Sequence, residues 1–112
     1  MTLEALSAYG ANTAEGMERC LNDETFYLEM VAMTLADGNF DKLKTAMDDR
    51  DVRAAFTAAH ALKGAVGNVA LTPIYEPLSA LTELLRGMDL PVEGGDKLLE
   101  KIMAAREKAL SL

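Results

Sequence analysis

Apolar residues recur at steps of three and four along residues 52–69, and this spacing constrains the fold more than any other feature. The stripe consists of Val52, Ala55, Ala59, Leu62, Val66 and Val69. Residues three or four positions apart share one face of an α-helix, so the stripe predicts an amphipathic helix over about residues 50–70. The other segments have the same period, and none alternates as a half-buried strand does. We therefore expect an all-α fold.

Turn and cap residues divide the chain into helices joined by short connections. We expect helices over about residues 2–9, 13–21, 24–36, 39–47, 50–70, 72–88 and 98–110. Asp23, Asp48 or Asp49, and Thr72 are suited to capping helix N-termini. Four substantial helices with short connections favour an antiparallel four-helix bundle with short additional N-terminal helices. We expect one domain over residues 1–112, with an N-terminal arm over 1–13 and a core over 14–112.

The distribution of apolar residues also predicts which segments lie inside. The segment 24–36 is apolar around most of its circumference, which is typical of a central, well-covered helix. The preceding helix is expected to turn three side chains inward: Met17, Cys20 and Leu21. One face of the segment 72–88 is expected to carry Ile74, Leu78, Leu81, Leu84, Leu85 and Met88. The glycines and Pro91 within residues 87–95 indicate a turn.

Composition narrows the classes of function. The formal net charge of −7 argues against nucleic-acid and anionic-membrane partners, which require a basic surface. Cys20 is the only cysteine, so no internal disulfide can form, and it is interpreted as a small buried hydrophobe. The N-terminus lacks the basic region of a secretory signal, and no apolar run is long enough to span a membrane. We expect a monomeric protein of the cytoplasm, and both a free-standing protein and a piece of a hybrid kinase stay open as interpretations.

His60 is the only histidine, and two glycines lie near it within the helical stretch. At 100° per residue, Gly64 and Gly67 fall on the same side of the helix as His60, away from the apolar stripe. A glycine inside a helix costs about 1 kcal/mol relative to alanine. Both glycines remove bulk beside an exposed, nucleophilic ring. We therefore expect something large to dock closely against the imidazole.

Further residues share the side of the helix that carries His60. The candidate docking surface consists of Arg53, Phe56, Thr57, Gly64, Gly67 and Asn68. Phe56 lies at the boundary with the apolar stripe, where residues more often edge a core than contact a partner. Lys63 places a cation one turn after His60, and an ordinary solvated lysine is an alternative interpretation.

Several chemistries are excluded by residue type. A usual zinc site needs several histidine or cysteine ligands, and the chain has one of each. A di-iron bundle needs Glu-x-x-His pairs, but Thr57 stands where that glutamate would be. There is no phosphate-binding Walker loop and no Gly-x-Ser-x-Gly elbow. We expect no metal and no cofactor in this chain.

The run His60-Ala61-Leu62-Lys63-Gly64 resembles the His-x-x-Lys-Gly signature of histidine-containing phosphotransfer (HPt) domains. Residues 22–35 resemble the apolar helix that precedes this signature in the family, and residues 39–47 resemble the short helix between them. The similarity covers about residue 14 to the C-terminus. One position departs from the pattern, because Ala70 stands where many members have glycine. Alanine is also small, so we expect tight helix packing there to survive.

The resemblance implies a phosphorelay carrier and not an enzyme. His60 would accept a phosphoryl group from the aspartate of a receiver domain and pass it to the receiver of a response regulator. Lys63 would stabilise phosphoryl oxygens or the partner surface, and Gly64 would let the receiver approach. The implied partners are response-regulator receiver domains and a sensor or hybrid histidine kinase, and the receiver would bind the Mg²⁺.

Two other classes of function stay open. The protein could be a helical interaction module whose histidine is never phosphorylated. It could also be an enzyme that uses His60 as a general base, although no orienting acid lies at local spacing. Transfer of label from a phosphorylated receiver separates the three hypotheses.

Overall fold

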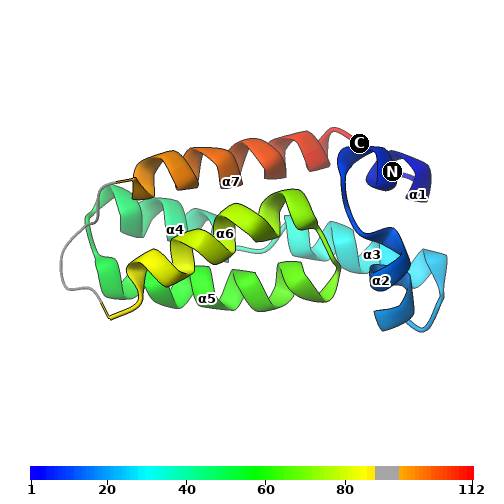
Figure 1. Ribbon diagram of the computed structural model, residues 1–112, viewed down its shortest axis with the longest axis horizontal. Coiled ribbons are helices and arrows are strands. Elements are labelled where there is room, and N and C mark those ends of the chain that lie inside the picture. Colours follow the sequence, from blue (N-terminus) through cyan, green and yellow to red (C-terminus); the bar gives the residue numbers. More distant parts are fainter. Residues whose placement is uncertain (88–93) are drawn as a thin grey trace.

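The computed structural model describes residues 1–87 and 94–112, which form seven α-helices and no strand (Figure 1). The helices are α1 Leu3–Tyr9, α2 Thr13–Arg19, α3 Glu24–Leu35, α4 Asn39–Asp48, α5 Val52–Asn68, α6 Thr72–Leu85 and α7 Gly95–Leu110. The all-α prediction is confirmed. The expected inward position of Met88 and the turn around Pro91 lie outside the described residues.

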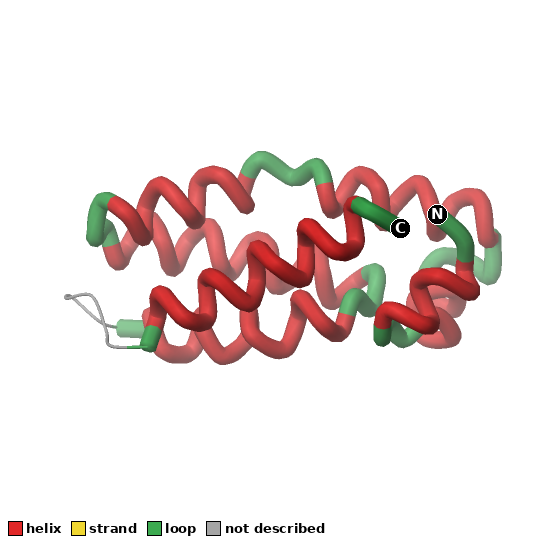
Figure 2. The backbone as a smooth tube through the Cα atoms, turned by 90° about the horizontal axis from the view of Figure 1, so that it is seen from above, coloured by secondary structure: helices red, strands yellow, loops and turns green. Residues whose placement is uncertain are grey.

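The last four helices pack side by side along the long axis of the molecule, which measures 42 × 22 × 19 Å. Helix α5 packs against α4 and α6, and α7 packs against α6 and α4. Helix α3 precedes α4 along the same long side, as Figure 2 shows from above. Helices α1 and α2 gather at one end, close to the C-terminus (Figure 1). None of the described helices has the length and apolar character that crossing a membrane requires.

Helix α5 buries the apolar stripe expected from the sequence, and all six of its residues are at most 7% exposed. The helix is shorter than expected because the backbone turns left-handed on both sides of it. Arg50 has a φ of 59° and Ala70 a φ of 56°, and neither angle fits a right-handed helix. Glycine adopts a positive φ readily. A glycine at position 70 would therefore adopt the observed backbone conformation more readily than Ala70 does.

Two of the expected helix caps are replaced by neighbouring residues. Asp23 caps α3 as expected, and its carboxylate accepts a hydrogen bond from the Phe26 backbone N–H at 3.0 Å. Asp51, and not Asp48 or Asp49, caps α5. For α6 the N-cap is Leu71, and no side chain caps the helix. Local composition identifies a capping region, but the geometry of the preceding turn selects the residue.

The N-terminal arm of residues 1–13 is docked on the core. Leu6 is fully buried. The Tyr9 hydroxyl donates a hydrogen bond to the Ala105 carbonyl of α7 at 2.8 Å, and burial raises the pKa of Tyr9 to about 12. The Asn12 backbone N–H donates to the Ala70 carbonyl at 2.9 Å. The arm therefore closes one end of the structure and is tied to the C-terminal end of α5.

Two expectations about buried residues are wrong. Leu21 was expected to point inward, but it is 84% exposed because the chain turns left-handed there, with a φ of 61°. Helix α3 was expected to be central and well covered, but it lies at the periphery and packs mainly against α2 and α7. Met33 and Phe26 are consequently 67% and 40% exposed. A helix that is apolar on all sides does not by its own sequence specify which other helices will pack against it.

Replacing Leu21 by glycine is expected to stabilise the protein. A non-glycine residue in the left-handed region costs about 1 kcal/mol, and this exposed side chain offers little burial in return. Leu21→Gly should therefore raise the free energy of unfolding by about 0.5–1 kcal/mol, measured from the urea midpoint. Met33→Gly is the matched control, since Met33 is exposed within the regular helix α3 and should lower stability. A lower midpoint for Leu21→Gly would show that the leucine side chain holds a stabilising contact.

Candidate functional site

His60 lies in the middle of α5, and its imidazole is exposed to solvent. The ring stacks on Phe56, one turn earlier in the same helix, with 5.7 Å between ring centres and 16° between ring planes. The guanidinium carbon of Arg86, which ends α6, lies 5.2 Å from the centre of the Phe56 ring. Aromatic stacking and a cation over a ring face are both favourable contacts. Phe56 and Arg86 therefore limit the orientations available to His60.

Lys63 follows His60 by one turn and is held on the side of α5 that faces α6. Its ammonium nitrogen lies 4.0 Å from a carboxylate oxygen of Glu83, which also contacts Arg86 at 3.1 Å. The hydrogen bond from Arg86, then the charge of Arg86, and to a smaller extent Lys63 hold the pKa of Glu83 below its usual value. Glu83 thus stays ionised and pairs with Lys63 beside His60 and with Arg86 over the Phe56 ring.

A hollow of about 410 Å³ opens beside the imidazole. It is lined by Arg19, His60, Lys63, Gly64, Gly67, Asn68 and Tyr75. The two glycines differ in what surrounds them. A Cβ at Gly64 would meet no atom within 4 Å, whereas a Cβ at Gly67 would lie 3.0 Å from the Tyr75 ring. Gly64 therefore leaves open space at the surface, while Gly67 lets Tyr75 pack against α5.

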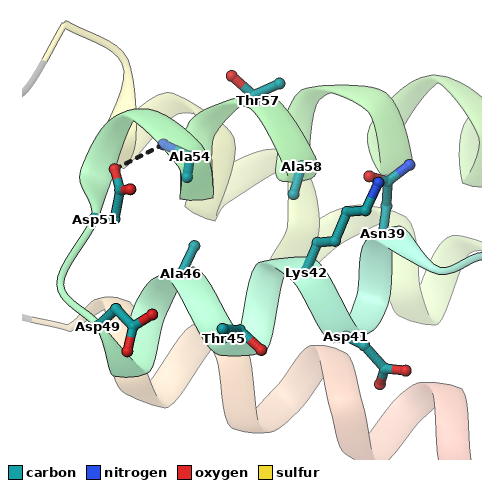
Figure 3. Close-up of a pocket in the computed structure, with 10 residues that line it drawn as sticks. All are labelled: Asn39, Asp41, Lys42, Thr45, Ala46, Asp49, Asp51, Ala54, Thr57 and Ala58. Atoms are coloured by element: carbon teal, nitrogen blue, oxygen red, sulfur yellow. Dashed lines mark hydrogen bonds between the residues drawn. The ribbon is translucent and has the colours of Figure 1, made fainter.

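The remaining candidate docking residues lie further from this hollow. Arg53 and Phe56 line a second depression that extends toward Leu85. Thr57 donates a hydrogen bond from its hydroxyl to the Arg53 carbonyl at 3.0 Å. Thr57 also lies at the α5 rim of a groove between α4 and α5, drawn in Figure 3. The structure thus brings Lys63, Gly64, Gly67 and Asn68 together with His60 and leaves Thr57 on a neighbouring surface.

Four residues of this surface were not identified from the sequence: Arg19, Tyr75, Glu83 and Arg86. The spacing of Glu83 and Arg86 is compatible with an ion pair along one helix. Their contacts with α5, however, depend on how α6 packs. Arg19 and Tyr75 likewise reach the site only through tertiary structure.

Among the described residues, no group of three or more His, Cys, Asp or Glu side chains is arranged to hold a metal ion. The residues around His60 are instead cationic, small or neutral, apart from Glu83. Such a surface offers a nucleophilic ring nitrogen, a nearby ammonium group for an anion and room for a second molecule. Such an arrangement can bring an anionic group of a second molecule close to a nucleophile.

Comparison with known proteins agrees with this geometry. A family model described as the Hpt domain matches residues 27–109, a segment that contains all of α4, α5 and α6. No match was found among curated proteins or among solved structures. Hpt domains act in phosphorelays as carriers in histidine phosphotransfer, in association with histidine kinases and response-regulator receiver domains. Because the match covers most of the sequence, including His60, the chain belongs to the Hpt domain family.

Proposed function

We propose that this protein carries a phosphoryl group on His60 between receiver domains of a phosphorelay. The observation that carries the proposal is the exposed imidazole on α5, with open space over Gly64 beside it. The neutral form of an imidazole has a ring nitrogen with a nucleophilic lone pair. A receiver domain can then approach this ring without displacing side chains of the helix.

The proposed transfer is a displacement at phosphorus. A ring nitrogen of His60 attacks the phosphorus of an aspartyl phosphate on the first receiver and forms a P–N bond. The P–O bond to the aspartate breaks, and its electron pair leaves with the carboxylate. The proton on the other ring nitrogen balances the charge or passes to solvent. The second receiver reverses these steps with its own aspartate, and we expect Mg²⁺ to be bound by the receivers.

The neighbours of His60 have distinct proposed roles. Lys63 brings positive charge to the phosphoryl oxygens, and Glu83 holds it in place from α6. Phe56 and Arg86 position the imidazole through the stacked contacts. Arg53, Thr57 and Asn68, with Gly67, are proposed to contact the outer part of the receiver.

The scaffold we propose for the carrier is an antiparallel four-helix bundle of α4 to α7, with α1 to α3 as additional helices. It is supported by the packing of α5 between α4 and α6 and of α7 against α6 and α4. The single domain over residues 1–112, the monomeric state and the cytoplasmic location stay predictions. The same holds for the sensor or hybrid histidine kinase that starts the relay.

The test is incubation of the purified protein with a receiver that carries labelled aspartyl phosphate. We expect the protein to acquire a label that is labile in acid and stable in alkali, as a phosphorus–nitrogen bond is. Complex formation without any label, tested against several receivers, would contradict the proposal and favour an interaction module that is not phosphorylated.

A further inference from the structure

Arg19 lines the hollow beside His60, although it lies outside the segment that the Hpt family model matches. It is the last residue of α2, and the matched segment begins only at residue 27. A cation at the site therefore comes from an N-terminal element that the general family pattern does not include. This position raises the question of what α2 contributes to the docking of a partner.

Close packing and hydrogen bonds hold helix α2 against the C-terminal end of α5. Gly16 packs against the Tyr27 ring so closely that a Cβ would lie 2.5 Å from a ring carbon. The Tyr27 hydroxyl in turn donates a hydrogen bond to the Val69 carbonyl at 2.9 Å. The bond from the Asn12 N–H to the Ala70 carbonyl holds the start of α2. The position of Arg19 relative to His60 is therefore set by the packed structure.

The Arg19 side chain is held at the rim of the hollow without being buried. Its guanidinium donates hydrogen bonds to the Gly67 carbonyl and to the Glu15 carboxylate, and 43% of the side chain stays exposed. With Lys63 it supplies two positive charges to the lining, whose other members carry no negative charge. Glu15 lies one turn before Arg19 on α2 and forms an ion pair with it. Glu83 of α6 lies 4.0 Å from the Lys63 ammonium nitrogen.

We propose that α2 forms part of the receiver-docking surface and that Arg19 attracts the anionic face of the phosphorylated receiver. The proposal rests on the proposed phosphoryl transfer to His60. An aspartyl phosphate is an anion, and a carrier with a formal net charge of −7 repels an anionic partner except through a locally basic surface. Arg19 and Lys63 line the hollow beside His60 and are the two cations of its lining. Arg19 acts on association and makes no bond to the transferring group.

The test measures the second-order rate of phosphoryl transfer from a labelled, phosphorylated receiver at low and high salt. Arg19→Gln is expected to lower this rate about threefold to tenfold at low ionic strength and by little at high salt, because screening removes the attraction. The final amount of phosphohistidine at saturating receiver should equal that of the wild type. Lys101→Gln on α7 removes the same charge away from the hollow and is expected to leave the rate unchanged. Equal rates for the two variants would refute the role of Arg19.

A second pair of variants separates charge from helix capping, because Arg19 also bonds to the Gly67 carbonyl. Glu15→Gln removes the opposing charge and leaves this bond, so it should speed transfer about twofold at low salt. Arg19→Lys should restore most of the rate lost in Arg19→Gln. Slower transfer in Glu15→Gln, or no rescue by lysine, would assign Arg19 a structural role. Absence of label on the wild-type protein would instead contradict the proposed function itself.

Discussion

Replacing His60 by glutamine is expected to reduce phosphoryl acceptance to background, a loss of at least about three orders of magnitude, because the variant lacks the ring nitrogen that forms the P–N bond. The measurement is transfer of label from a phosphorylated receiver, followed over time on a denaturing gel. Glutamine keeps a polar, hydrogen-bonding side chain at an exposed position of α5, so the surface seen by the receiver changes little.

The fold of His60→Gln is expected to stay intact. The imidazole is exposed, and it stacks on Phe56, a contact that contributes about 0.5–1.5 kcal/mol. Helical circular dichroism should match that of the wild type, and the urea midpoint should fall only slightly. Competition by the variant for the same receiver checks that docking survives. Label on the folded variant would place the acceptor on another residue and overturn the role of His60.

The sequence predicted the helix that carries the site because that information is local. Steps of three and four define one face of α5 whatever its neighbours are, and Val52 to Val69 are buried on that face as expected. The outward position of His60 follows from the same geometry. The ends of α5 were placed less well, since the left-handed residues Arg50 and Ala70 are neither glycine nor asparagine and give no local sign of a turn.

Features that depend on packing could not be predicted in this way. The exposure of Phe26 and Met33 is decided by which helices lie beside α3, and residues 24–36 alone hold no such information. Tyr75 and Glu83 come to α5 from the following helix, and Arg19 comes from 41 residues before His60 in sequence. Gly64 and Gly67 share one side of α5, so the sequence alone does not distinguish them. The position of Tyr75 shows that Gly67 lies at a packing contact, whereas Gly64 borders open space.

Replacing Gly64 by glutamine is expected to slow phosphoryl transfer about tenfold to a hundredfold, because added bulk beside His60 displaces the receiver from the distance that transfer requires. The same change should raise the free energy of unfolding by about 0.5–1 kcal/mol, since glutamine favours a helix over glycine and a Cβ there meets nothing within 4 Å. Activity and stability are thus expected to move in opposite directions. Transfer rates and urea midpoints of the same preparation measure both.

The matched comparison is Gly64→Ala with Gly67→Ala, two glycines three residues apart on the same helix. Both changes gain helix propensity, but at Gly67 the new Cβ would lie 3.0 Å from the Tyr75 ring, which must shift. Gly64→Ala should therefore stabilise by about 1 kcal/mol, and Gly67→Ala by clearly less. If Gly64→Gln instead lowers the urea midpoint while the folded fraction transfers phosphoryl groups at the normal rate, Gly64 is a packing residue. The open space beside His60 would then have no part in docking.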